Sequence, residues 1–195
     1  MNALEAIRRR RSVARLGEPG PDEEQLRQIL AAAACAPDHE ELRPWRFVVL
    51  LGEEKDAFGE VLVSALLHRA EEEGWSPTEG QISKERTKFN RAPVVVAFGC
   101  VPKAHKIPAH EQLLSTAAAA ENALIAATAL GFHSIWRTGQ PAYDPVVKTA
   151  LGLEQGDSIV GWLYIGTAKK APEERAEPNL DGLVTYWRPE VPATV

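Results

Sequence analysis

The sequence predicts an α+β fold with a mainly antiparallel central sheet flanked by helices. Apolar strand-like segments are few, helical segments are more numerous, and the two kinds do not alternate strictly as they do around a parallel sheet. The chain has 195 residues, of which 45% are hydrophobic and 25% charged. This size and composition suit one domain with a proper core.

Five helices are expected, over residues 2–10, 21–36, 54–73, 110–130 and 144–151. Asn2 is a capping residue for the first helix, with Glu5 as its capping-box partner. Pro21 is expected at the first position of the second helix. Gly74 and Gly131 end the two long helices, because glycine adopts the left-handed conformation that closes a helix. In the helix over 110–130, alanine surrounds the axis, which indicates burial on every side or packing against a copy of itself.

Four apolar segments predict strands, over residues 45–51, 92–100, 132–136 and 157–168. Residues 75–91 are polar and lack periodicity, so they predict a surface excursion. A further β-type segment, LVTYW at 183–187, follows a linker rich in proline and charge. A lone apolar segment of this kind often docks away from its sequence neighbours, sometimes on a partner chain.

The composition excludes several classes of protein. A net charge of -5 argues against general nucleic-acid binding, which needs a broad basic face. The two cysteines form no CxxC pair, which favours a reducing, cytoplasmic setting over a disulfide scaffold. The sequence contains no apolar run long enough to predict a membrane span, and no apolar run follows the basic N-terminal stretch as in a secretory signal. The five histidines are scattered, so no metal site is expected.

The arginines near the N-terminus are the most unusual feature. Five of the 22 basic residues of this acidic chain lie between Arg8 and Arg15, around Ser12. Guanidinium groups and a hydroxyl suit a phosphate. The same run also suits a solvated basic face, or helix C-terminal charges that answer the helix dipole. The sequence pattern alone leaves both interpretations open.

Two other segments are candidates for a binding site. His39 lies in a loop before the strand at 45–51, where site residues are common, although a loop histidine also serves as a cap. A strand ends at Trp136-Arg137-Thr138-Gly139. The glycine there indicates either a backbone that a ligand can approach closely or a plain turn. Cys35 reads on its own as a small core residue. No GxGxxG, Walker-type or GxSxG motif is present.

Taken in order, AIRRRRSVARL, APDHEELRPWRFVVL, APVVVAFG, AATALGFHSIWRTG and SIVGWLYIGT resemble the nitroreductase family of flavin enzymes. The likeness is to its small YdjA-like branch and spans about residues 2–187. It implies a nitroreductase-like α+β sandwich that forms an intertwined homodimer with FMN at the interface. Residues 1–170 would be the FMN-binding domain, and residues 171–195 an extended arm that packs on the partner subunit.

The resemblance implies a cofactor site made of Arg10, Arg11, Ser12, Cys35, His39, Trp136, Arg137 and Thr138. The first three would hold the FMN phosphate and neighbouring atoms. Cys35 and His39 would lie near the flavin of the same or the other subunit, and the last three along the isoalloxazine edge. The nicotinamide nucleotide would lie along Ala126, Ala127, Thr128, Ala129, Leu130 and Gly131. Two positions depart from the family pattern: Arg43 replaces a common glutamine, and Arg15 follows the signature serine by three positions instead of two.

The implied activity is ping-pong transfer of hydride from NAD(P)H through flavin N5 to nitroaromatic, quinone or similar electrophilic acceptors. The protein would position the cofactor and tune its charge, with no side-chain nucleophile. Dehalogenation, flavin cleavage and a non-catalytic flavin-binding module stay open as alternatives. The physiological acceptor, the choice between NADH and NADPH, and which arginine lies near flavin N1 and O2 also stay open.

Overall fold

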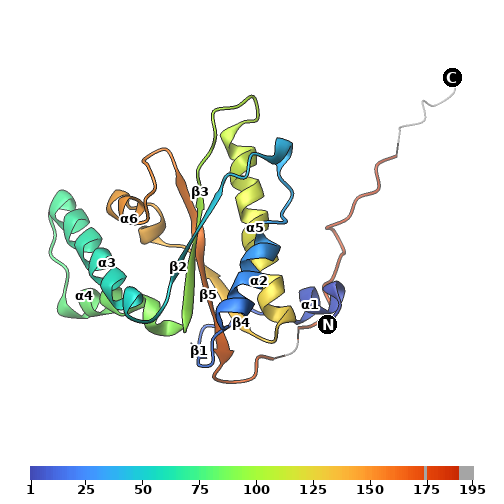
Figure 1. Ribbon diagram of the computed structural model, residues 1–195, viewed down its shortest axis with the longest axis horizontal. Coiled ribbons are helices and arrows are strands. Elements are labelled where there is room, and N and C mark those ends of the chain that lie inside the picture. Colours follow the sequence, from blue (N-terminus) through green and yellow to red (C-terminus); the bar gives the residue numbers. More distant parts are fainter. Residues whose placement is uncertain (174, 189–195) are drawn as a thin grey trace.

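The computed structural model describes residues 1–173 and 175–188, and in this part a central sheet is covered by helices on both faces (Figure 1). The helices are α1 Ala3–Arg9, α2 Glu23–Ala33, α3 Gly52–Glu73, α4 Glu79–Arg86, α5 Ala109–Ala129 and α6 Pro145–Ala150. Short 3-10 turns are η1 His39–Glu41, η2 Lys88–Arg91 and η3 Gln140–Ala142. The strands are β1 Leu16–Gly17, β2 Trp45–Leu50, β3 Val94–Cys100, β4 His133–Arg137 and β5 Ser158–Ala168.

The sheet is antiparallel throughout its named strand pairs, which confirms the predicted fold class. β5 pairs with β3 along one edge and with β4 along the other, and its last residues pair with β1. In the described part of the chain β2 pairs with β3 alone and is therefore an edge strand. Only Leu50 of β2 is buried, so the prediction of a buried strand at 45–51 is wrong in its burial.

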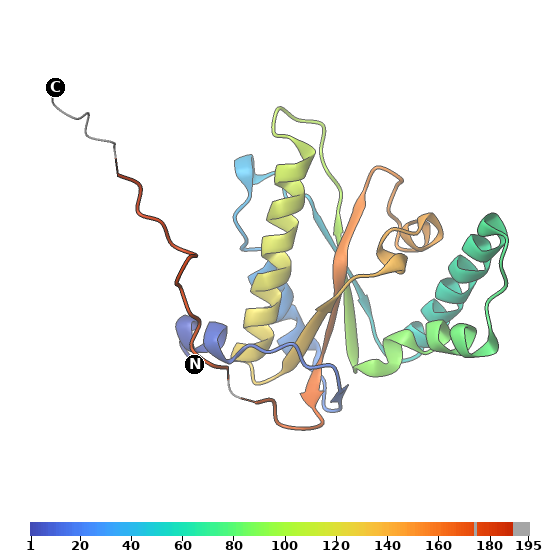
Figure 2. The same cartoon turned by 180° about the vertical axis from the view of Figure 1, so that it is seen from behind.

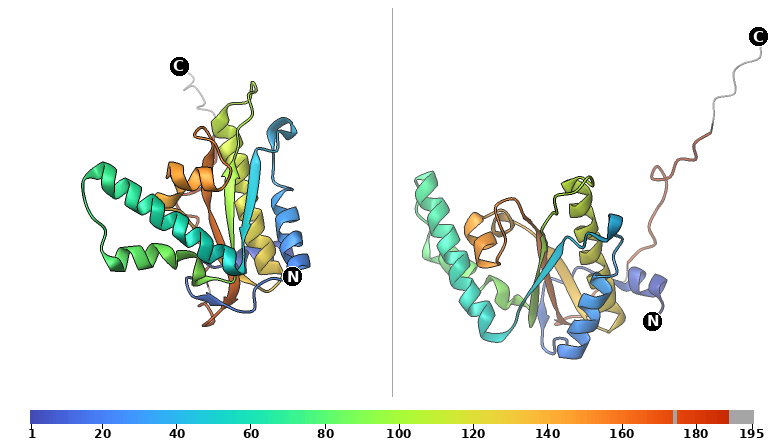
Figure 3. Two further views of the ribbon diagram at one scale, coloured as in Figure 1. Left: turned by 60° about the vertical axis from the view of Figure 1, so that its left-hand side comes forward. Right: turned by 45° about the horizontal axis from the view of Figure 1, so that its top comes forward.

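The two faces of the sheet build two cores, because successive side chains of a strand point to opposite sides. Trp162 and Tyr164 of β5 belong to the core with α3 and α6. Leu163 and Ile165 belong to the core with α2 and α5. Figure 3 shows α2 and α5 on one side of the sheet and α3, α4 and α6 on the other.

Helix caps confirm two of the predicted starts. Asn2 Oδ1 accepts a hydrogen bond from the Glu5 backbone N–H at 2.9 Å, and Asp144 caps α6 through Val146. The start of α2 differs from the prediction: Asp22 is the N-cap and forms a capping box with Gln25, so Pro21 lies outside the helix. None of the helices in the described residues is long and apolar enough to cross a membrane.

Residues 75–91 lie at the surface as predicted, apart from the buried Phe89, and most of this excursion forms α4 and η2. Thr78 and Gln81 make a capping box at the start of α4. No residue of α4 is buried, which explains why the sequence has no apolar period there. The chain packs closely on α3, since a Cβ on Gly59 would lie 2.1 Å from the Arg86 carbonyl oxygen.

The segment at 183–187 forms no strand in the structure, contrary to the prediction. Leu183, Tyr186 and Trp187 are 76%, 83% and 84% exposed. The arm from residue 175 to 188 leaves the body beside α1 and extends away from it (Figure 2). A strand needs a neighbouring strand for its backbone hydrogen bonds, and this arm has none within the described residues of its own chain. Residues 174 and 189–195 of the predicted arm lie outside the described residues.

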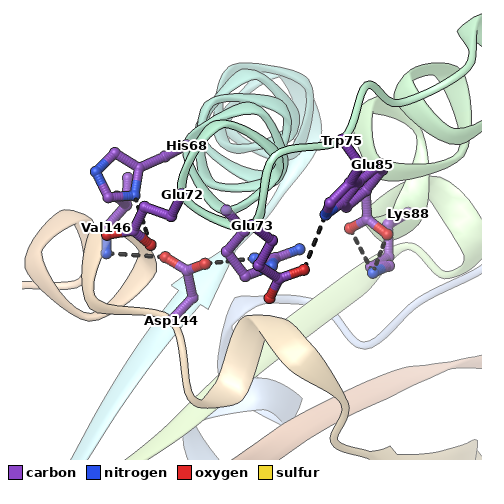
Figure 4. A network of polar contacts seen from close by, with 9 residues as sticks. His68, Glu72, Glu73, Trp75, Glu85, Lys88, Asp144 and Val146 are labelled. Carbon is purple, nitrogen blue, oxygen red and sulfur yellow. Dashed lines mark hydrogen bonds and ion pairs between the residues drawn. The ribbon is translucent and has the colours of Figure 1, made fainter.

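A polar network joins α3 to the loop before α6 (Figure 4). Arg69 donates to Asp144, whose side chain is 1% exposed. Asp144 also accepts from the Val146 N–H at 2.9 Å. Close by, Lys88 pairs with Glu85, which links η2 to α4. These contacts hold the start of α6 against α3 and the start of η2 against α4.

A β-bulge in β5 shapes the surroundings of β4. The β3–β5 register shifts between Phe98 and Gly99, which leaves Val160 without a register partner on β3. The Val160 carbonyl accepts a hydrogen bond from the Trp136 indole N–H at 3.2 Å. Gly161 makes this approach possible, because a Cβ there would lie 2.0 Å from Trp136 Nε1.

We therefore expect Gly161→Ala to displace the Trp136 ring and to lower the free energy of unfolding by about 1–3 kcal/mol, as overpacking does. Urea denaturation measures the loss. Gly156→Ala is the matched control, because a Cβ there meets nothing within 4 Å. Its stability should stay within about 0.5 kcal/mol of the parent. Equal stability of the two variants would contradict the packing role of Gly161.

An aromatic cluster fills the core beneath α3. Phe89 lies 4.7 Å from Trp162 and 5.9 Å from Tyr164 between ring centroids. Burial raises the pKa of Tyr164 to about 12, although Arg91 and Arg137 nearby favour its charged form. The folded state therefore holds a proton that the unfolded chain releases near pH 10.

Tyr164 should make the protein less stable in strong alkali. The free energy of unfolding that depends on this bound proton is complete below pH 10. It is lost between about pH 10 and 12 and amounts to about 2–3 kcal/mol. Tyr164→Phe cannot release this proton. The stability difference between parent and variant, measured by urea denaturation from pH 8 to 11.5, should shift in favour of the variant as the pH rises. A difference independent of pH would contradict the buried neutral phenol.

Candidate functional site

Arg11 joins the N-terminal segment to the chain that follows β5. Its Nε donates to the Glu173 carbonyl at 3.1 Å. Its Nη1 donates to the carbonyls of Arg8 and Arg10, both at 3.0 Å. The guanidinium is therefore held in one place by backbone groups that leave its charge uncompensated.

Two adjoining cavities surround Arg11 and share Pro172 and Glu173 in their walls. The larger, of about 610 Å³, is lined by Arg11–Arg15 and by Lys170–Glu173. The smaller, of about 380 Å³, is lined by Arg8, Arg9, Arg11, His133, Pro172, Glu173 and Arg175. We call the two together the arginine groove. Among the described residues of its walls, the cations outnumber Glu173, and Ser12 adds a hydroxyl, so the groove suits a phosphate.

Arg10 turns away from the arginine groove. Its Nε lies 3.5 Å from Glu121 of α5, and its side chain is 17% exposed. Of the three residues predicted to hold the phosphate, Arg11 and Ser12 therefore line the groove, whereas Arg10 contacts Glu121 of α5.

β4 leads from the groove to the predicted flavin edge. Val13 N–H donates to the Ser134 carbonyl at 3.0 Å, beside a parallel bridge between Ser12 and Ser134. From Ser134 to Thr138 an extended chain advances about 13 Å. The two predicted regions therefore lie at the two ends of one short strand.

The side chains at the end of β4 point to opposite faces. Trp136 packs with the α2–α5 core. The Arg137 guanidinium lies 5.8 Å from the centre of the Tyr164 ring, on the α3–α6 face. Gly139, with φ 105°, follows in a conformation that favours glycine, and a Cβ there would meet nothing within 4 Å. The sequence predicts Trp136 and Arg137 as parts of one site. The pleat of β4 instead places their side chains on opposite faces of the sheet.

A cavity of about 340 Å³ opens at this strand end, and we call it the Arg91–Arg137 cavity. Its walls are Lys88, Arg91, Arg137, Thr138, Gly139, Pro141, Trp162 and Tyr164.

Two buried polar atoms in the described residues have no hydrogen-bond partner, and both belong to strands of this region. They are Ser134 Oγ on β4 and Trp162 Nε1 on β5. An unsatisfied buried group of this kind costs about 1–3 kcal/mol, so it is commonly satisfied by a ligand or an ordered water. Ser134 lies opposite Ser12 of the arginine groove and Trp162 lines the Arg91–Arg137 cavity, so these unsatisfied atoms fit binding sites better than purely structural edges.

His39 lies elsewhere in the single chain. Its Nδ1 is 3.1 Å from Glu111 Oε2 near the start of α5, and its side chain is 60% exposed. Glu121, the partner of Arg10, is ten residues further along α5, which is about 15 Å. Cys35 is exposed and free after the end of α2. One chain alone does not bring His39 to the arginine groove.

The predicted nucleotide segment lies partly at the surface. Thr128 and Gly131 line a cavity of about 180 Å³ together with Arg9, Arg11 and His133. Ala127 is fully buried in the α2–α5 core, so its side chain serves packing. Ala126 and Leu130 are half-buried and Ala129 is exposed.

Lys170 and Arg175 are groove residues that the sequence reasoning missed, and Arg15, which it set aside, also lines the groove. The signal for Lys170 was the basic pair Lys169-Lys170 directly after the last strand of the sheet. The backbone bond between Lys169 N–H and the Arg15 carbonyl, at 3.1 Å, explains why this pair meets the N-terminal segment.

The chain is similar to known proteins along most of its length. Residues 7–167 match the model of the nitroreductase family. A protein of Escherichia coli K12, provisionally named the NAD(P)H nitroreductase YdjA, is 38% identical over 96% of this chain and 100% of its own. A provisionally named NAD(P)H nitroreductase of Haemophilus influenzae is 31% identical over 95% of this chain and 100% of its own.

Solved structures have the same fold. A nitroreductase-like family protein from Bacillus cereus is 25% identical, with a TM-score of 0.77 over 97% of each chain. A nitroreductase with bound FMN from Bacteroides fragilis is 24% identical, with a TM-score of 0.72 over 96% of this chain and 100% of its own. With a family match over most of its length and relatives above 30% identity along their whole length, the chain belongs to the nitroreductase family.

Proposed function

We propose that the protein is an FMN-dependent oxidoreductase that takes hydride from NAD(P)H and reduces nitroaromatic, quinone or similar electrophilic acceptors in a ping-pong cycle. The observation that supports this most is the arginine groove at one end of β4, with an open glycine turn at the other end. Family membership, and the bound FMN of the Bacteroides fragilis relative, support the same cofactor.

In this proposal the groove residues hold the FMN phosphate. Arg11 offers a fixed charge, Ser12 a hydroxyl, and Lys170 a mobile ammonium from the opposite wall. Arg10 acts by anchoring the segment to α5 through Glu121. The sequence-based proposal that Arg10 touches the cofactor itself stays a prediction.

The strand end positions the reactive part. When bound, FMN supplies the two-electron chemistry. The Gly139 N–H has no hydrogen-bond partner among the described residues, so it and Thr138 are free to orient a flavin edge. Trp136, fixed by the Val160 carbonyl, would pack beside it. Thr128 and Gly131 would border the nicotinamide nucleotide, with Arg9 within reach of its phosphates.

A second copy of the chain completes the site in this proposal. Leu4 of α1 and Leu114 of α5 are 69% and 65% exposed, and Trp187 of the arm is 84% exposed. Apolar surface of this kind marks an interface. The arm, predicted over residues 171–195, would pack on the partner subunit, and His39 and Cys35 would approach the partner's flavin. A cytoplasmic location stays a prediction.

The visible spectrum of the purified protein tests the proposal. We expect absorbance of oxidised flavin that bleaches anaerobically with NADPH or NADH and returns on addition of a nitroaromatic or a quinone. A flavin that neither nucleotide bleaches would indicate a binding module instead. Turnover with halogenated phenols, and none with nitroaromatics or quinones, would indicate a different reaction on the same fold.

Removal of groove contacts should release FMN. We expect Ser12→Ala with Lys170→Ala to weaken FMN binding roughly 100- to 10,000-fold, since each of the two lost hydrogen bonds to a charged group contributes about 1.5–3 kcal/mol. Quenching of FMN fluorescence measures the affinity. Lys169→Ala is the matched control, because that side chain lies over Gly17 of β1. Equal affinity in both variants would contradict the phosphate assignment.

Loss of the arm should weaken the dimer. We expect deletion of residues 179–195, or Tyr186→Ala with Trp187→Ala, to shift the protein toward monomer at micromolar concentration, because these side chains are exposed on a single chain. Sedimentation velocity measures the mass. Arg175 and the groove remain in both variants. A monomeric parent protein, or an unchanged dimer in both variants, would rule out the packing role of the arm.

A further inference from the structure

The Arg91–Arg137 cavity borders the proposed flavin edge through Thr138 and Gly139, but the proposed flavin contacts leave its two guanidinium groups unused. Arg91 comes from η2, at the end of the insertion between α3 and β3, and Arg137 comes from β4. Trp162 and Tyr164 of β5 form the apolar wall. Four separate parts of the chain, η2, β4, β5 and the start of η3, thus meet around one small space.

The cavity has a net positive charge. Lys88 is neutralised by Glu85, whose Oε1 lies 2.6 Å from its Nζ. Within residues 1–173 and 175–188, neither Arg91 nor Arg137 has an ion-pair partner. Tyr164 remains a neutral phenol at ordinary pH, because burial raises its pKa to about 12. Two guanidinium groups therefore face the same space without a counter-charge.

A second and independent observation indicates an acceptor ligand. Trp162 is 2% exposed, and its indole N–H has no hydrogen-bond partner in the described part of the chain. An indole N–H can only donate, and a guanidinium can only donate. The group that satisfies all three must therefore accept hydrogen bonds and bear negative charge. A carboxylate does both, and its two oxygens match the guanidinium fork.

We propose that the Arg91–Arg137 cavity binds a small carboxylate, between the two guanidinium groups and with the Trp162 N–H as an additional donor. The volume of about 340 Å³ fits a ligand of the size of a benzoate. The stack of Arg137 on Tyr164 holds one guanidinium in place before the ligand arrives. This site is separate from the arginine groove, and its ligand does not require bound flavin.

The Trp162 indole signal in proton–nitrogen NMR spectra of the purified protein tests this proposal. The chain has five tryptophans, so the indole region is simple, and Trp162→Phe assigns the signal. Titration with sodium benzoate at constant ionic strength should move the Trp162 signal downfield and saturate. Arg91→Gln should weaken this binding about tenfold or more. Arg91→Lys, which keeps the charge, should retain part of it.

The control is Arg86→Gln, which removes an exposed arginine of α4 that pairs with Glu60 outside the cavity. It should bind benzoate like the parent. Unchanged signals of the other four tryptophans would show that each variant is folded. Absence of a Trp162 shift up to about 20 mM benzoate, a range that includes very weak binding, would overturn the proposal. So would equal affinity in Arg91→Gln, or saturable binding of inorganic phosphate without binding of benzoate.

Discussion

Burial of β5 on both faces and along both edges is the constraint on which the rest of the structure depends. Residues 161–166 are all buried, and their neighbours β3 and β4 cannot shift without exposing one of the two cores. The bulge at Val160 then fixes Trp136, and Tyr164 fixes Arg137. Because β5 runs on into residues 169–173, it also determines where one wall of the arginine groove lies.

The concentration of arginines in an acidic chain follows from this arrangement. Arg11 uses its donors on three backbone carbonyls, which orders the groove but leaves its positive charge in place. Arg9 and Arg10 pair with Glu5 and Glu121 and therefore add less to the local field. The remaining positive charge comes from both ends of the domain. The hydrogen bond from the Lys169 N–H to the Arg15 carbonyl brings Arg15 and Lys170, which both line the groove, close together. A phosphate would thus tie the two ends of the domain together.

The fold class and five of the helices could be predicted from the sequence, because caps, glycine stops and apolar runs are local signals. α4 could not, because it is a polar helix with no buried residue and depends on close contact with Gly59. β1 is too short for a pattern. In the site, the resemblance indicated Arg11, Ser12 and Arg137. It could not reveal that the strand pleat sends Arg137 toward Tyr164, or that Lys170 returns to the N-terminal segment.

A single chain leaves apolar side chains exposed and His39 far from the groove, and a second copy of the chain would cover the former and supply a second His39. Within residues 1–173 and 175–188, the apolar side chains of the arm have no neighbouring strand, and β2 is an edge strand that pairs with β3 alone. His39 is held by Glu111 far along α5 from Arg10, although the resemblance places both near one flavin. Leu4 and Leu114 leave apolar surface on the same side of the sheet as these residues. In the proposed dimer, one symmetric partner would bury this surface and bring a second His39 toward the groove.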